Sequence, residues 1–361
     1  MKSQSRHIQS LATLQFAAVI TIVLAHFWLK DATYLQALCT SFCFVYSGYF
    51  TALKHRDDRP YRLADHARYM RDKLAKLYPL HVFALAFSFL AIFIGWGSTP
   101  IFTRVTLAQL LLVSSWSTSP SFYFGINPVA WFICDLFFLY LISPFLIRLI
   151  KRFGLGWQVI IVGVLIIGEL VAAYAPNAAS PSLLIPEKPH YYLYQFPLIR
   201  ILEFITGIVM YHLTLSEPWR KAASRLTPAR ATLVELCGLA VLIALALTGE
   251  KLLLPHWYRA YCSVAPAVIA VLGAFVFTSG NMGLASRAMC LPPLPALSRI
   301  GAEVYLLQFG SYYLIRSLAR WLELPTSGAV YFLIQMGSLL AIAWAVHHLL
   351  TMPLYRRLRS R

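Results

Sequence analysis

Charged residues are scarce in this chain. Only 12% of its 361 residues are Asp, Glu, Lys or Arg, and only 14 residues are acidic. Soluble globular proteins carry about a quarter charged residues and roughly half apolar ones. Here 59% of the residues are apolar, 14% are aromatic and the mean hydropathy is +0.66. The shortage of charge excludes a cytosolic enzyme and a disordered tail, and it predicts a protein with several spans in a lipid bilayer.

Cysteine pairs and long polar segments are also missing. The six cysteines are scattered through mostly apolar stretches, and no CxxC pair occurs. We interpret them as small core residues, so the sequence predicts neither a disulfide framework nor a metal site. The net charge is +17, but no segment is long and polar enough for a soluble basic domain, so nucleic-acid binding is not expected. Residues 1–361 are expected to form a single integral membrane domain.

Apolar runs of about 20 residues, the length that crosses a bilayer, recur along the chain. They lie near residues 10–29, 34–53, 77–97, 129–148, 156–175, 194–214, 231–248, 258–279, 299–318 and 328–350. The sequence therefore predicts an all-α polytopic membrane protein with about ten transmembrane helices. A shorter apolar stretch at 106–115 predicts an interfacial or re-entrant helix. Outer loops near 98–128 and 176–193 are interpreted as lids or acceptor-binding loops.

The distribution of Lys and Arg predicts the orientation. With the N-terminus inside, 23 of the 31 Lys and Arg residues fall in inner segments, eight of them in 54–76. Cytoplasmic loops of membrane proteins carry such an excess. We therefore expect both termini in the cytoplasm and an even number of spans. The expected location is the inner membrane of a bacterium.

Ionisable side chains inside apolar spans are costly unless they pair or face water, so they are functional candidates. These residues are His26, Asp135, Glu169, Arg200, Glu203, Glu235, Arg259, Glu303 and Arg316. His26 lies near the outer end of the first span, where a neutral imidazole can act as a general base near pH 7. The alternative is an interfacial histidine bonded to a carbonyl. Glu169 and Glu235 are interpreted as structural.

Pairing or anion binding is indicated for some of these residues and for a basic cluster. Arg200 and Glu203 are three residues apart, so they can pair on one helix face. Asp135 needs a partner from another helix, either for a structural hydrogen bond or to orient a catalytic group. A basic cluster precedes the third span, where cations suit a phosphate group at the cytoplasmic face; it comprises Arg71, Lys73 and Lys76. The alternative for this cluster is membrane topology alone.

Six short segments stand in a characteristic order. They are LATLQFAAVITIVLAHF (ending near His26), FVYSGYF (with Ser47), RDKLAKLYPLH (with Lys73 and Lys76), NPVAWFICDLFFLYLISP (with Trp131 and Asp135), FPLIRILEFITG (with Arg200 and Glu203) and IGAEVYLLQF (with Glu303 and Gln308). In this order they resemble the membrane-bound acyltransferase 3 family, whose members O-acylate cell-surface glycans and related acceptors.

The resemblance implies acyl transfer from cytoplasmic acyl-CoA, with acetyl-CoA as the expected donor and no permanently bound cofactor. The acceptor would be a hydroxyl of a cell-surface or exported polysaccharide or glycolipid, and a polysaccharide biosynthesis complex is an expected partner. His26 would be the general base or a transient acyl acceptor, oriented by Asp135 or Glu203. The donor would be bound by Arg71, Lys73, Lys76 and Gln15. Residues expected to support the acceptor or the structure are Ser47, Trp131, Arg200, Glu303 and Gln308.

Four positions depart from the family pattern. Gln15 replaces a common Arg, Lys73 and Lys76 replace an Arg-x-x-Arg pair, and Gln308 replaces a frequent His. Lys keeps the positive charge but loses the bidentate fork of Arg. Two alternatives to the enzyme stay open: a transporter or flippase of a glycan precursor, and a catalytically degenerate family member. Transporters often show two halves with matching broken helices, and no such symmetry is visible in this sequence.

Overall fold

The fold is helical throughout the part of the chain that the structure describes. The structure is a computed structural model that describes residues 2–29, 32–55, 62–96, 104–174, 191–253 and 264–359. Every regular element in these ranges is a helix, which confirms the all-α prediction. Arg259 and most of the predicted loop 176–193 lie outside the described residues.

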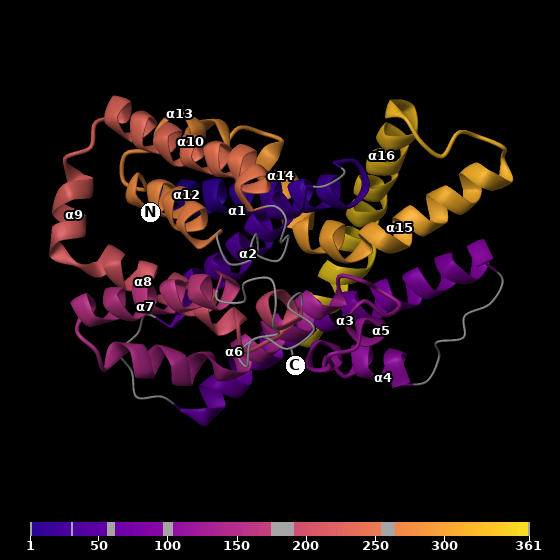
Figure 1. Cartoon of the computed structure of the whole chain (residues 1–361), viewed down its shortest axis with the longest axis horizontal. Helices are drawn as coiled ribbons and strands as arrows, with labels where there is room; N and C mark the ends of the chain where they lie inside the picture. The colour runs from indigo at the N-terminus through magenta and orange to yellow at the C-terminus, as the bar shows by residue number, and fades with distance from the viewer. Residues whose placement is uncertain are drawn as a thin grey trace. The chain divides into compact units, whose positions relative to one another are not determined.

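The described part of each predicted apolar stretch overlaps a helix (Figure 1), and residues 258–263 of the eighth stretch lie outside the described residues. In chain order these helices are α1 (Lys2–Phe27), α2 (Thr33–Lys54), α3 (Leu63–Trp96), α6 (Ala130–Lys151), α7 (Leu155–Tyr174), α8 (Arg200–Leu215), α10 (Pro228–Leu253), α12 (Ala265–Phe277), α15 (Gly301–Trp321) and α16 (Ala329–Val346). The agreement follows from the length of the apolar runs, because a span must satisfy all of its backbone groups within one helix.

Short helices connect the long ones. They are α4 (Arg104–Leu110), η1 (Ser114–Trp116), α5 (Pro120–Tyr123), η2 (Tyr191–Gln195), α9 (Glu217–Ser224), α13 (Leu284–Ala288), α14 (Leu294–Leu297), η3 (Ser298–Ile300), η4 (His347–Thr351) and α17 (Met352–Arg359). The stretch at 106–115 lies on α4 and the start of η1, so the predicted short helix is present. Two of these elements, η2 and η4, are π-helical.

Several helices have the length and composition of membrane spans. Among the described residues, six qualify: Arg6–Phe27, Leu63–Gly95, Ala130–Lys151, Tyr191–Leu215, Pro228–Thr248 and Ala329–Arg359. Shorter apolar helices occur at Leu155–Val171 and Ala265–Phe277. These helices identify a membrane protein, whereas the count of about ten spans and the orientation of the termini stay predictions. Helix α2 is more polar than a lipid-facing span, and its polar residues Thr40, Ser41 and Ser47 are buried among neighbouring helices.

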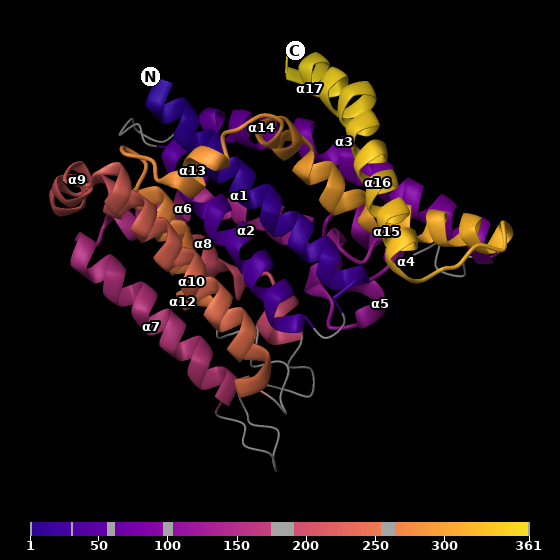
Figure 2. The ribbon, with the colours of Figure 1, turned by 90° about the horizontal axis from the view of Figure 1, so that it is seen from above.

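Two compact units make up the described chain, and each combines two separate stretches of sequence. The first unit comprises Met1–Arg59 and Ile142–Arg299, and the second comprises Pro60–Leu141 and Ile300–Arg361. In the first unit, α2 packs against α1, α8, α10 and α12. In the second unit, α15 packs between α3 and α16, and η4 and α17 also contact α3 (Figure 2). The expectation of a single domain over the whole chain stays a prediction.

Helices α2 and α8 cross with only backbone between them. A Cβ atom at Gly48 would collide with the carbonyl group of Phe204 on α8. In turn, a Cβ at Gly207 would collide with the carbonyl oxygen of Val45 and lie 2.6 Å from the backbone nitrogen of Tyr49, both on α2. Small residues permit such close approach between helices in membranes. The two glycines therefore set the distance between α2 and α8.

Replacing Gly207 with alanine is expected to destabilise the protein by about 1–3 kcal/mol, because the added methyl group meets fixed backbone atoms. Thermal unfolding of the purified protein in detergent would measure this loss. The matched control is Gly168→Ala on α7, where an added Cβ meets nothing within 4 Å. Equal melting temperatures for Gly207→Ala and the control would contradict a backbone-to-backbone crossing.

Candidate active site

His26 stands at the C-terminal end of α1 and contacts the next helix. Its half-buried imidazole places Nε2 2.9 Å from Nε2 of Gln36 on α2. A glutamine amide can donate to a ring nitrogen with its NH2 group or accept from one with its carbonyl oxygen. Gln36 can therefore orient the ring in either neutral tautomer, as the third residue of a triad orients a catalytic histidine.

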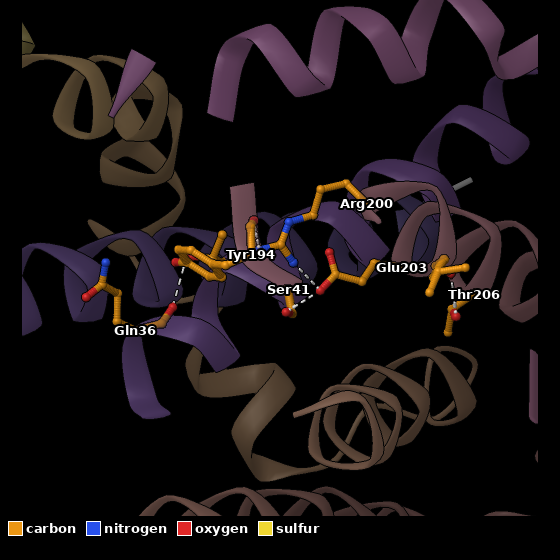
Figure 3. Close-up of polar contacts among 8 residues, drawn as sticks. Gln36, Ser41, Tyr194, Arg200, Glu203 and Thr206 are labelled. Carbon is orange, nitrogen blue, oxygen red and sulfur yellow. Dashed lines mark hydrogen bonds and ion pairs between the residues drawn. The ribbon is translucent and has the colours of Figure 1, made fainter. Parts of the chain in front are cut away.

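Hydrogen bonds continue from Gln36 along α2. One turn later, the Thr40 hydroxyl donates to the backbone carbonyl oxygen of Gln36 at 2.9 Å. The same hydroxyl accepts from the phenol of Tyr194 in η2, also at 2.9 Å (Figure 3). Tyr194 is buried, and its hydroxyl thus ties η2 to the turn of α2 that carries Gln36.

Arg200 and Glu203 form a buried ion pair at the start of α8. Nη1 of Arg200 donates to Oε1 of Glu203 at 2.6 Å, and the exposed fractions of the two side chains are 1% and 5%. The Ser41 hydroxyl from α2 donates to the same carboxylate oxygen, and Nη2 of Arg200 donates to the Tyr194 carbonyl. Figure 3 shows these side chains pointing toward one another between α2, η2 and α8. The predicted pairing of Arg200 with Glu203 is confirmed.

Aromatic rings surround the buried guanidinium. The centre of the Arg200 guanidinium lies 4.6 Å from the centroid of the Tyr194 ring and 5.1 Å from that of Phe44. A cation over an aromatic face is stabilised most when both are removed from water. The side chain therefore joins α2, η2 and α8 through charge, hydrogen bonds and ring contacts together.

Gln36 is the functional candidate that sequence reasoning missed. Its side chain is a neutral amide in an apolar stretch, so the criterion of an ionisable group inside a span does not select it. A usable signal was present, since Gln36 follows His26 by ten residues, just past the turn between two predicted spans. Glu203, predicted to orient His26, instead engages Arg200 and Ser41. Asp135, predicted for the same role, is fully buried on the part of α6 that belongs to the second unit.

Two further predicted residues of the first unit lie on the helices of this site. Gln15 is half-buried on α1, the same continuous helix that carries His26. Ser47 is buried on α2, and its hydroxyl donates to the Cys43 carbonyl at 2.8 Å. That hydrogen bond is local to the helix and indicates a structural role for the Ser47 hydroxyl.

Glu169 and Glu235, which we interpreted as structural, occupy different environments in the first unit. Glu235 is fully buried and accepts hydrogen bonds from the Thr278 hydroxyl, the Gly283 nitrogen, and the nitrogen and hydroxyl of Ser286, at 2.6–3.1 Å. It thereby anchors the start of α13, as the structural interpretation requires. Glu169 lines a small pocket together with Ser41 and Glu203.

The second unit holds a buried pair of a histidine and a carboxylate. Nδ1 of His347, in the π-helical turn η4, donates to Oε1 of Glu303 at 2.8 Å. Gln308, one turn further along α15, is buried and donates from Nε2 to the Tyr305 carbonyl at 2.8 Å. Trp131 is also buried in this unit. These contacts fit the supporting role expected for Glu303 and Gln308.

The predicted donor-binding cations all lie on α3 in the second unit. Arg71 and Lys76 are exposed. Lys73 is different, because its Nζ lies 3.9 Å from the centroid of the Tyr140 ring and 5.4 Å from that of Tyr69. Lys73 is thus held by aromatic rings, while its two neighbours present their charges to the surroundings.

Comparison with known proteins shows the family to which the chain belongs. The model of an acyltransferase domain, that of the acyltransferase 3 family, matches residues 8–348, nearly the whole chain. The chain belongs to the acyltransferase 3 family. This acyltransferase 3 protein is also 26% identical, over 250 residues, to acyltransferase MdmB of Streptomyces mycarofaciens. That match covers 67% of this chain and 60% of the relative's length. No solved structure matches. Membership of the acyltransferase 3 family supports acyl transfer as the reaction.

Proposed function

We propose that this protein is a membrane-bound O-acyltransferase that moves an acyl group from acyl-CoA to a hydroxyl of a cell-surface or exported polysaccharide or glycolipid. Acetyl is the acyl group we expect. The observation that carries the proposal is the half-buried imidazole of His26, held 2.9 Å from the amide of Gln36 at the end of the first helix of an acyltransferase 3 protein. An imidazole held in one orientation can remove a proton from an acceptor hydroxyl.

The proposed reaction assigns each proton and bond. The acceptor oxygen attacks the thioester carbonyl carbon while a nitrogen of His26 takes the hydroxyl proton. The C–S bond then breaks, and the CoA sulfur leaves with the proton that the imidazolium returns. Gln36 keeps the ring in place through both transfers, as the orienting member of a triad does. In the other role proposed for His26, the ring itself accepts the acyl group before the hydroxyl does.

The proposed topology places donor and acceptor on opposite sides of the membrane. About ten spans, with both termini in the cytoplasm of a bacterium, bring the basic start of α3 to the inner face and His26 near the outer face. The excess of Lys and Arg in the inner segments supports this arrangement.

Labelled acetyl-CoA tests the proposed function. The purified protein in lipid nanodiscs is expected to release CoA at a rate that rises with added glycan acceptor, and the label should appear on the glycan. Acid quenching before acceptor is added distinguishes the two roles of His26, because only the acyl-acceptor role leaves label on the protein. If the protein neither releases CoA nor transfers label to any hydroxyl acceptor, the result favours a transporter or a degenerate family member.

Gln36→Leu is expected to lower kcat by about 10–100-fold. Without the amide the imidazole of His26 loses its fixed position, and a shift of about 1 Å in a catalytic group can lower the rate by about 100-fold. The KM for acetyl-CoA should change little, since Gln36 contacts the imidazole and not the proposed cations. Gln36→Glu should recover part of the activity, because a carboxylate can hold the ring as an amide does. Steady-state kinetics in nanodiscs would measure both constants. The control is Gln9→Leu, at an exposed position of α1; equal kcat values for the two Leu variants would contradict an orienting role.

A further inference from the structure

The last described helix is strongly basic and exposed. Helix α17 carries three arginines among its eight residues and no acidic residue. None of its residues is buried, and Arg356, Arg357 and Arg359 are all exposed. The guanidinium of Arg359 lies 6.0 Å from the centroid of the Tyr355 ring on the same helix. Within the described residues of the second unit, α17 thus presents a cluster of cations that the proposed mechanism has not used.

The packing of the second unit brings α17 to the basic end of α3. Gly310 of α15 faces Phe87 and Ser88 of α3, and further along Gly95 of α3 faces Ser317, so α15 runs parallel to the C-terminal part of α3. The contact between His347 and Glu303 places the end of α16 beside the start of α15.

Helix α17 follows η4 directly and also packs against α3 (Figure 2). Because the chain leaves α16 at the level where α15 begins, α17 continues past that level. Its contact with α3 is therefore assigned to the earlier part of that helix, which holds Arg71, Lys73 and Lys76. Two basic segments that are distant in sequence therefore share one end of the second unit.

The charges on these two segments are unbalanced. Residues 62–76 and 352–359 contain eight Lys and Arg residues and two carboxylates, Asp65 and Asp72. Asp65 is 3.6 Å from the guanidinium of Arg68, so one carboxylate already has a cation of its own. Arginine presents a planar fork of donors that matches the oxygens of a phosphate, whereas lysine acts as a point charge. Lys73 and Lys76 have no guanidinium group, but α17 presents three of them beside α3.

We infer that Arg356, Arg357 and Arg359 of α17, together with Arg71 and Lys76 of α3, bind the phosphate groups of the acyl-CoA donor. The inference rests on the proposed function and adds a second segment to its donor site. Coenzyme A carries a diphosphate and a separate 3′-phosphate, so it presents several anionic groups to a surface built from two helices. Anionic lipid headgroups share the phosphate chemistry, and the experiment below separates the two sources.

Binding of CoA itself, measured by calorimetry on the full chain in zwitterionic nanodiscs, tests the site without requiring turnover. The triple variant Arg356→Gln/Arg357→Gln/Arg359→Gln is expected to weaken CoA binding by about 10–50-fold. The wild type should prefer CoA over dephospho-CoA, and the triple variant should lose most of that preference. Replacing the same three residues by Lys should cost less, because charge is kept and only the fork is lost.

The matched control is Arg220→Gln/Lys221→Gln/Arg225→Gln, three cations on and next to the short basic helix α9 of the first unit. It should bind CoA as the wild type does. Wild-type affinity in the α17 variant, with transfer intact in the wild type, would overturn this inference and leave the proposed function standing. If the α17 variant loses only its binding to vesicles containing phosphatidylglycerol, the phosphates belong to lipid and the inference is likewise overturned. A wild type that binds no CoA would instead contradict the proposed donor.

Discussion

Replacing His26 with alanine is expected to lower acyl transfer at least about 100-fold, the usual loss when a general base is removed. The side chain is half-buried and contacts the amide of Gln36 at 2.9 Å, so the substitution removes the proposed reacting group and leaves α1 and α2 otherwise intact. Transfer of labelled acetyl groups to the acceptor, at matched amounts of protein in nanodiscs, would measure the effect.

Two controls separate chemistry from folding in the His26 experiment. His348→Ala removes an exposed imidazole from η4 and should keep full transfer activity. The melting temperature of His26→Ala should stay close to that of the wild type, because alanine is a good helix former. Retention of more than about a tenth of wild-type activity would exclude both the base and the acyl-acceptor role, since either requires the imidazole.

Replacing Arg200 with alanine is expected to destabilise the protein by about 3–5 kcal/mol, because it leaves a buried carboxylate without its cation. Glu203 is 5% exposed, and the guanidinium also donates to the Tyr194 carbonyl, so several groups lose a partner at once. The expected result is a large drop in folded protein recovered in detergent, read by size-exclusion chromatography and thermal unfolding.

A double variant tests whether the Arg200–Glu203 pair is structural alone. Buried ion pairs can often be replaced by apolar residues of similar volume without loss of stability. Arg200→Met/Glu203→Leu should therefore recover much of the stability that Arg200→Ala loses. Recovered stability together with recovered transfer would assign the pair a structural role, whereas stability without transfer would place it in the catalytic machinery. A wild-type melting temperature for Arg200→Ala would contradict the buried pair itself.

Much of the fold could be predicted because apolar run length decides where a membrane helix forms. The helix boundaries near α6 and α15 follow from this property alone. The pairing of Arg200 with Glu203 was equally accessible, since a spacing of three residues within one helix brings the two side chains together. The helix boundaries and this ion pair depend only on residues close together in the sequence, so both can be predicted from it.

The features that could not be predicted from the sequence depend on contacts between distant segments. Glu303 and His347 are separated by 44 positions, and their contact requires the π-helical turn η4 and the antiparallel return of α16. Lys73 was expected to face phosphate, but the fold places the ring of Tyr140 3.9 Å from its Nζ. The division into two units, each from two stretches of sequence, has no composition shift or linker to mark it. Periodicity and spacing within one segment do not contain these relationships.

The crossing of α2 and α8 at Gly48 and Gly207 matters for helix assembly and not for membrane insertion. Insertion into a membrane depends on the hydrophobicity of each helix taken singly, and an alanine in place of either glycine would not impair it. Assembly comes later and depends on the backbones meeting, which the added methyl group prevents. A Gly207→Ala chain should thus reach the membrane in normal amounts and be lost there to quality-control proteases, as inserted but unpaired helices.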